Sequence, residues 1–402
     1  MSSRPVALRR YALVLLCGSM VAVVAAWVLW IIGLVDADGG ADPNGNPLGI
    51  DYAIFHTAGQ ILSTGDGSTL YDESEFLAVL ATTTGDDDQD PSRLFVNPPI
   101  FAALFMPMAE LPYRTGLLIW TGMGILALGA GLRLAGGRIS PAVAAGAFLF
   151  YPVFVGVRLG QNSFLSLLLL ATCFAMLDKG NQPLAGIALG LLIFKPQLAL
   201  GTALWWTIDL RRYRRAWIAA LATAGSLATI GWLLWPDATR AYLTGLPELV
   251  GFRRPEFLRS TLSPYGFFAL SLPGRDSAIV VLTILAAIGG LVWFWAYWRD
   301  HRTDLTGLFA LSVVLSLWMS PRAVVYDWTL LLIPAVILAT RRRDLKDTWL
   351  MLGGLVALVA TISIQLTEAQ LNSLGWAVQI AVPALALVAV GAARALRARP
   401  TG

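Results

Sequence analysis

Long apolar runs recur along most of this chain, and they limit its possible folds more than any other feature. A helix needs about 20 predominantly apolar residues to cross a bilayer. Runs of this kind lie near residues 11–34, 115–136, 141–157, 163–177, 183–208, 216–235, 277–298, 305–320, 324–340, 347–366 and 373–393. We therefore predict an all-α integral membrane protein, a multi-pass bundle of about 11–13 helices that forms a single polytopic domain over residues 1–402.

Three segments need separate interpretation. The apolar run after the N-terminal arginines is too long for the core of a signal peptide, so we expect an uncleaved first membrane helix. Segment 98–112 begins at Asn97-Pro98-Pro99 and is either a short span or a re-entrant hairpin. Segment 264–273 is too short to cross alone, and we expect it at the membrane interface.

The charges are few and unevenly placed. Basic residues gather in short loops, whereas acidic residues concentrate in the long loop 36–97. The positive-inside rule then predicts a cell-membrane protein with cytoplasmic N- and C-termini, the latter a tail over 394–402, and with extracytoplasmic loops at 36–97 and 236–276. Nucleic-acid binding would need a basic face on a folded domain, so we expect the lipid bilayer and no nucleic acid as a partner.

Helix alternation leaves two topologies open between 98 and 208. If 98–112 crosses the membrane, Gly160-Gln161-Asn162 falls on the cytoplasmic side. If the chain instead re-enters the membrane at a break near Lys195-Pro196, the alternation of helices is reversed, and Gly160-Gln161-Asn162 falls on the extracytoplasmic side.

The first long loop contains an amphipathic pattern next to an acidic residue. Ile54, Ala58, Ile61 and Leu62 follow the spacing of one helix face, which predicts a helix lying on the membrane surface. Asp51 stands immediately before this pattern. It is either an N-cap, because aspartate is favoured there, or a general base that takes a proton from an acceptor hydroxyl.

The same loop carries an ordered set of motifs. Asp51-Tyr52-x-x-Phe55-x-x-Ala58, with Gly65 and Leu70-Tyr71 after it, resembles the first extracytoplasmic loop of glycosyltransferase family 87. Later segments resemble further family elements in the same order, over about positions 50 to 330. They are Asn97-Pro98-Pro99 with Met106-Pro107-Met108-Ala109-Glu110-Leu111-Pro112, then Gly160-Gln161-Asn162, Lys195-Pro196-Gln197 and Ser320-Pro321. One departure is the histidine that family members often carry after the late Ser-Pro, where this chain has Arg322 and, further on, Tyr326.

The resemblance implies a function. Members are polyprenol-phosphate-mannose-dependent α-mannosyltransferases of the GT-C superfamily, which implies a membrane hexosyltransferase with inverting chemistry. The hexose, by this resemblance mannose, would pass from a polyprenyl-phosphate sugar to a glycolipid or polysaccharide acceptor on the extracytoplasmic face, with Asp51 as general base. Sugar and acceptor contacts would come from five residues: Tyr52, His56, Gln161, Asn162 and Tyr326. Gln161 and Asn162 have the alternative of a polar turn between helices.

A lipid-phosphate donor also needs cations near the membrane face. Lys195 interrupts an apolar run beside Pro196, so it either binds the donor phosphate in a broken helix or snorkels at a helix end. Arg322 follows a span directly and is a phosphate ligand or an interfacial anchor. Arg253 and Arg254 lie in an outer loop, where they bind either that phosphate or anionic headgroups.

No His/Asp/Glu cluster has metal-ligand spacing, so we expect no metal and no cofactor beyond the lipid-linked donor. A transporter or flippase of envelope glycolipids is the alternative function, although no internal repeat of the kind common in transporters stands out. A non-catalytic scaffold of an envelope assembly is the third.

Overall fold

The computed structural model describes residues 4–37, 40–42, 47–65, 67–85, 93–249, 258–341 and 346–397. In this part of the chain the ordered elements are helices, and the paired extended backbone amounts to two isolated bridges, Ala41 with Pro47 and Thr261 with Val324. The predicted all-α class is confirmed for the described residues.

Among the described residues, five helices are long and apolar enough to cross a bilayer. They are α1 (Arg4–Val35), α6 (Tyr113–Gly136), α12 (Leu210–Leu234), α16 (Asp276–Asp300) and α19 (Lys346–Leu374). The 24 residues of α6 extend about 36 Å, which exceeds the roughly 30 Å of bilayer hydrocarbon. α7 (Pro141–Phe148) and α8 (Tyr151–Leu159) meet the same criterion together, with a 63° bend between them. The protein is therefore a multi-pass membrane protein.

Other apolar helices are shorter than a bilayer crossing, and their ends meet inside the bundle. These are α9 (Ser163–Asp178), α10 (Gln182–Gly190) with η4 (Leu191–Phe194), and α17 (Leu305–Met319). The 16 residues of α9 extend only about 24 Å. The ends meet because Lys195, after η4, contacts both Gln161, before α9, and Asp327 in η6 (Val325–Leu331). Lys195, Gln161 and Asp327 therefore form a group of polar side chains inside the bundle, where these shorter helices end.

The predicted span 183–208 is not one helix. It breaks at Lys195, whose φ of −140° and ψ of 62° are not helical, before the chain continues as η5 (Pro196–Ala199) and α11 (Leu200–Ile208). The physical cause is Pro196, which lacks an N–H group and disfavours helical dihedrals in the residue before it. Two shorter helical segments, α10 with η4 and η5 with α11, therefore replace the single span that was predicted.

Segment 98–112 likewise is not one helix. It forms three short pieces, α4 (Pro99–Ala102), η3 (Ala103–Phe105) and α5 (Met106–Ala109), which pack along α2 (Ile50–Thr64). The approach is close, because a Cβ on Gly59 would lie 2.7 Å from the carbonyl carbon of Phe105. The hydrogen bond between Gln161 and Asp51 places Gly160-Gln161-Asn162 at the same end of the bundle as Asp51.

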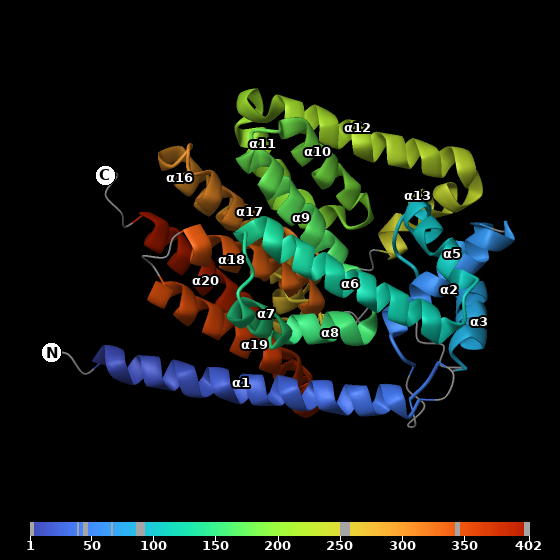
Figure 1. Ribbon diagram of the computed structural model, residues 1–402, viewed down its shortest axis with the longest axis horizontal. Coiled ribbons are helices and arrows are strands. Elements are labelled where there is room, and N and C mark those ends of the chain that lie inside the picture. Colours follow the sequence, from blue (N-terminus) through green and yellow to red (C-terminus); the bar gives the residue numbers. More distant parts are fainter. Residues whose placement is uncertain are drawn as a thin grey trace.

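Figure 1 shows this arrangement. We call the right-hand end, where α2, α3 (Glu73–Thr84), α5 and α13 (Pro236–Leu249) gather, the α2 end. α1 begins at the other side, which we call the opposite end. There, Arg341 at the end of α18 (Leu332–Arg341) forms a bidentate ion pair of 2.7 Å with Asp178 at the end of α9.

The amphipathic prediction for α2 is wrong in one respect. The helix exists, but the side chains from Tyr52 to Gly59 are all buried, so it does not lie on the membrane with a solvated face. The reason is tertiary packing, because α3, α4, η3 and α5 cover it.

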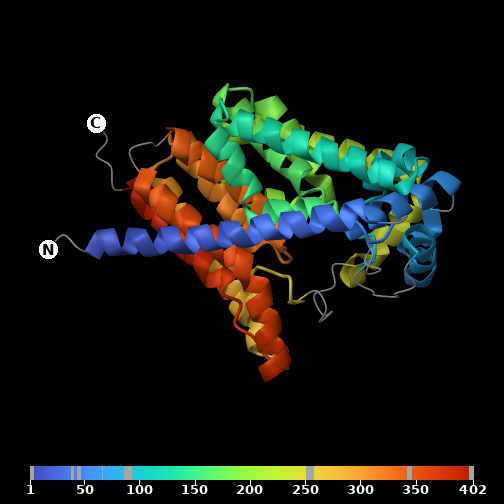
Figure 2. The same ribbon diagram turned by 60° about the horizontal axis from the view of Figure 1, so that its bottom comes forward.

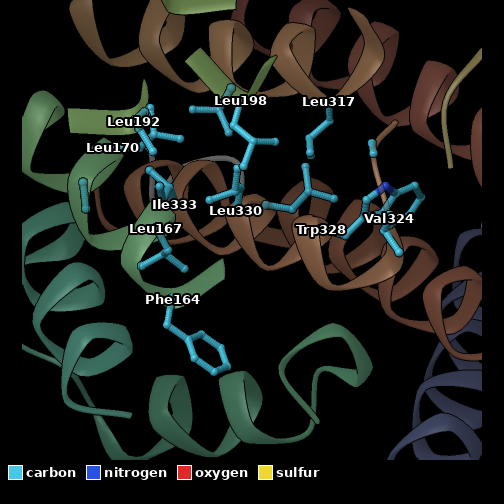
Figure 3. Close-up of a cluster of buried hydrophobic side chains, with 14 of the residues drawn as sticks. Phe164, Leu167, Leu170, Leu192, Leu198, Leu317, Val324, Trp328, Leu330 and Ile333 are labelled. Carbon is cyan, nitrogen blue, oxygen red and sulfur yellow. The ribbon is translucent and has the colours of Figure 1, made fainter. Parts of the chain in front are cut away.

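A dense apolar core surrounds the break at Lys195. Figure 3 shows the labelled core side chains, with Leu192 and Leu198 from the two sides of the break lying among Leu317, Leu330, Trp328 and Ile333. In Figure 2, the end of α19 stands away from the rest of the bundle beside α15 (Pro264–Ser271). The backbone N–H of Ala377, between α19 and α20 (Ala381–Arg397), donates to the carbonyl of Leu270 at 3.0 Å.

Candidate active site

Asp51 lies in the first turn of α2 but does not cap it. The N-cap is Gly49, whose φ of 61° starts the helix without a side-chain hydrogen bond. The Tyr113 hydroxyl fixes this entrance by donating to the carbonyl of Leu48. The half-buried Asp51 carboxylate instead accepts a hydrogen bond from Gln161. Its side chain is therefore directed toward the turn between α8 and α9.

Burial raises the pKa of Asp51 from 3.8 to about 6. The hydrogen bond from Gln161 and the positive charges of Lys195 and Arg322 oppose this rise, whereas the negative charge of Asp327 adds to it. These effects show that four residues distant in the sequence lie around Asp51. A carboxyl with such a pKa is ionised at neutral pH and still basic enough to take a proton.

Lys195 and Asp327 form a buried ion pair. The Lys195 Nζ lies 3.0 Å from Asp327 Oδ1, and the two side chains are only 10% and 2% exposed. The other carboxylate oxygen, Oδ2, accepts from the backbone N–H of Val324 at 3.0 Å. Nζ also lies 3.5 Å from Gln161 Oε1 and 4.7 Å from the centre of the Tyr326 ring. The lysine therefore joins the broken helix, the α8–α9 turn and η6.

Gln161 is held by this network in one orientation. Its Oε1 accepts from Lys195 and from the backbone N–H of Asn162 at 3.1 Å. The amide nitrogen is consequently the atom left to donate to Asp51. Lys195 thus positions the group that contacts the carboxylate.

The turn before Gln161 requires a glycine. Gly160 has a φ of 69°, and a Cβ there would lie 2.5 Å from the Cβ of Tyr52. Trp120 Nε1 donates to the Gly160 carbonyl at 2.8 Å and fixes the turn from the other side. α2 and the α8–α9 turn therefore pack with their backbones almost in contact, which brings Asp51 within reach of Gln161.

Arg322 is held by a short pairing of two loops. The backbone N–H of Leu262 donates to the carbonyl of Ala323 at 2.6 Å, and Ser263 Oγ donates to the carbonyl of Pro321 at 3.2 Å. The arginine is half-buried and close enough to Asp51 to lower its pKa. The chain 320–324 is thus a fixed support for a cation beside the carboxylate.

Several buried polar atoms of these segments have no protein partner among the described residues. They are both side-chain amide atoms of Asn162, the hydroxyls of Ser163, Ser320 and Thr329, and the indole nitrogen of Trp328. Buried polar groups are normally hydrogen-bonded, so these atoms retain unused capacity to donate or accept hydrogen bonds.

Tyr52 and His56 face an aromatic layer instead. The His56 ring lies 5.7 Å from Tyr52 and 5.6 Å from Tyr113, and burial lowers its pKa. Burial raises the pKa of Tyr52, whose hydroxyl meets the backbone of α6 near Gly116. Both side chains support α2 rather than contact the carboxylate. Arg253 and Arg254 lie outside the described residues.

Asp327 is the site residue that sequence reasoning missed. A signal existed, because an aspartate inside the apolar run 324–340 has the same significance as a lysine inside the run 183–208. An unpaired charge is costly in a membrane, so the aspartate and the lysine in these two apolar runs together predict an ion pair. Among the described residues, no three metal-ligating side chains lie together.

One comparison with known proteins gives a match. The model described as glycosyltransferase family 87 matches residues 95–321. This range includes Gln161 and Lys195 and ends one residue before Arg322, whereas Asp51 precedes it. No curated protein and no solved structure gives a significant match.

Proposed function

Because that match covers more than half of the chain, the protein belongs to glycosyltransferase family 87, and we propose that it transfers a hexose from a polyprenyl-phosphate sugar. Mannose is the first sugar to test. The acceptor in this proposal is a glycolipid or polysaccharide, and transfer occurs with inversion on the extracytoplasmic face. The cluster around Asp51 is the active site.

The observation that carries this proposal is the meeting of Asp51, Gln161, Lys195 and Arg322 at one place. They come from four distant segments, and each was singled out by sequence before the fold placed them together. A structural ion pair alone would not require the additional half-buried carboxylate, which costs stability because of its raised pKa.

In the proposed reaction, Asp51 acts as general base. An acceptor hydroxyl oxygen attacks the anomeric carbon on the face opposite the phosphate, and its proton passes to the Asp51 carboxylate. The bond between the anomeric carbon and the phosphate oxygen breaks, and its electron pair leaves with polyprenyl phosphate. The products are the glycosylated acceptor and the lipid phosphate.

Arg322 is the better cation for the departing phosphate, although Lys195 was an equal candidate from sequence. The Lys195 ammonium is committed to Asp327, and removing it from a buried partner is costly. Arg322 is half-buried beside Asp51, and a guanidinium suits phosphate oxygens. Lys195 then acts as a positioning residue through Gln161.

The remaining contacts suit a sugar. Asn162, Ser163 and Ser320 hold buried hydrogen-bonding groups that sugar hydroxyls would satisfy. The Tyr326 ring lies 4.7 Å from the Lys195 ammonium and so belongs to the same group of residues. In this proposal, a membrane-anchored donor presents its phosphate to the residues that lie where α9 begins and α17 ends.

The test uses purified protein with polyprenyl-phosphate sugars and membrane acceptors, and mass spectrometry of the product. Asp51→Asn should abolish transfer while membrane insertion stays intact. Asp237→Asn is the matched control, because Asp237 is an exposed carboxylate at the start of α13. Activity with nucleotide sugars alone, or full activity of Asp51→Asn, would overturn the proposal.

A further inference from the structure

A second set of polar residues lies at the opposite end, away from Asp51. A cavity of about 550 Å³ is lined by Gly180, Gln182, Pro183, Arg211, Arg212, Arg214 and Arg215. It lies where the turn between α9 and α10 meets the first turns of α12. Because α9 alone extends about 24 Å from Asn162 to this turn, the cavity is separate from the proposed active site.

The cavity is strongly basic. Four arginines line it, and no acidic side chain does. Arg212 is partly engaged, since its Nη1 donates to the carbonyl of Arg302 at 2.7 Å, and its own carbonyl accepts from Gln182 at 2.8 Å. Arg211, Arg214 and Arg215 are exposed. Three guanidinium groups at the mouth of one cavity form a site for an anion with several oxygens.

An apolar groove adjoins this cavity and shares residues with it. It has a volume of about 660 Å³ and is lined by Thr207, Leu210, Arg211, Arg214, Trp217, Ile218 and Leu221. Arg211 and Arg214 belong to both. Ile218 and Leu221 are 61% and 62% exposed on the outer face of α12, where lipid is the only apolar solvent available.

The helix places charge and apolar surface in the order in which a lipid presents them. Arg211, Arg214, Ile218 and Leu221 line the same groove, and the spacing of four and three residues from Arg214 onward places the last three on one face of α12. Arg211 precedes a kink at Tyr213, where the backbone is not helical. The lining is therefore basic at the start of α12 and apolar from the third turn on, and the distance along the axis from Arg214 to Leu221 is about 10 Å. A phosphate at the arginines and a hydrocarbon chain along Ile218 and Leu221 would fit both parts at once.

We propose that this site binds an anionic phospholipid, with the headgroup phosphate in the arginine cavity and an acyl chain in the groove of α12. A free phosphate ion would use only the cavity, and a zwitterionic lipid would use the groove but gain less from the arginines. The joint lining by Arg211 and Arg214 therefore favours a ligand that carries both a net negative headgroup and a long chain.

The experiment titrates the purified full-length protein with phosphatidylglycerol and counts bound lipids by native mass spectrometry. Arg211→Gln with Arg214→Gln should weaken the apparent affinity by about thirtyfold, since each basic residue near an anionic surface contributes about fivefold. The matched control is Arg133→Gln with Arg138→Gln, because both are exposed arginines where α6 ends, at the same end of the bundle. This control should leave the affinity within about threefold of the wild type.

Two further ligands distinguish the source of the anion. Phosphatidylcholine with the same chains tests the headgroup charge, and dihexanoyl phosphatidylglycerol tests the chain. Phosphatidylcholine should bind at least about tenfold more weakly, because it offers the arginines no net negative charge. Dihexanoyl phosphatidylglycerol should also bind at least about tenfold more weakly, because losing two buried methylenes is already enough for such a change. Equal competition by inorganic phosphate, or an equal loss in the two pairs of variants, would overturn the proposal. Unchanged binding by the Arg211/Arg214 variant would overturn it as well.

Discussion

The ion pair between Lys195 and Asp327 makes a sharp prediction about stability. At 3.0 Å and an effective dielectric of about 20, the attraction of two unit charges is on the order of 5 kcal/mol, and the loss of hydration largely offsets it. Removing one partner removes the attraction and leaves the other charge buried. Lys195→Met should therefore lower the free energy of unfolding by about 3–5 kcal/mol.

A second substitution should reverse most of that loss. Asp327→Asn removes the buried charge but keeps a side-chain oxygen to accept from the backbone N–H of Val324. The double variant Lys195→Met/Asp327→Asn should therefore return to within about 2 kcal/mol of the wild type, a coupling that a double-mutant cycle measures directly. The assay is reversible unfolding in mixed micelles, followed by tryptophan fluorescence.

The control is the other cross-helix pair described above. Arg341 and Asp178 form a bidentate pair at 2.7 Å, but each side chain is 37% exposed, so Arg341→Met should cost about 1 kcal/mol or less. An equal loss for Lys195→Met and Arg341→Met would refute the reasoning from burial. So would a double variant no more stable than Lys195→Met alone.

Asp51, Gly160 and Arg322 each give a further expected outcome. Because burial raises the pKa of Asp51 to about 6, kcat/KM should rise with pH through about 6; a flat profile between about pH 5 and pH 8 would contradict the role of base. The folded state binds this proton more tightly than the unfolded chain, so the free energy of unfolding should fall as the pH rises from 3.8 to about 6, and Asp51→Asn should remove that fall in pH-dependent unfolding curves. Gly160→Ala should reduce transfer more than about tenfold, because it adds a clash with Tyr52 to the cost of its φ of 69°; Gly180→Ala, at a φ of 73° with no atom within 4 Å, should cost only about 1 kcal/mol in thermal unfolding and leave transfer intact. Arg322→Gln should lower transfer about a hundredfold and Arg322→Lys less, measured as initial rates over a donor titration.

The sequence predicted the long helices well because their signal is local. An apolar run such as 277–298 has one low-energy arrangement in a bilayer, and α16 (Asp276–Asp300) follows it closely. The half-length helices were harder, because hydropathy does not distinguish a whole span from two halves of it. At Lys195-Pro196 the sequence suggested the break, but only the fold shows that the broken segment contacts Gln161 and Asp327.

Prediction of the site residues shows the same difference between signals that are local in the sequence and contacts that depend on the fold. Asp51, Gln161, Lys195 and Arg322 were identified by residue type and motif, and the structure brings them together. The partner of Lys195 was not found, because Asp327 is 132 residues away and pairing across such a distance depends on the fold. His56 was chosen for its chemistry, but its position one turn beyond Tyr52 directs it into the aromatic layer. Whether Tyr326 and Asn162 contact a sugar stays a prediction.

The shortness of α9 and α17 also bears on how reactants would reach the Asp51 carboxylate in the proposed reaction. Molecules that diffuse laterally in the membrane can reach a reaction centre that lies within one leaflet without leaving the lipid phase. On the proposed chemistry, turnover then depends on the mole fraction of donor in the membrane rather than on its amount per volume of solution. Diluting vesicles in buffer should leave the rate per enzyme unchanged, whereas diluting the donor with inert lipid should lower it.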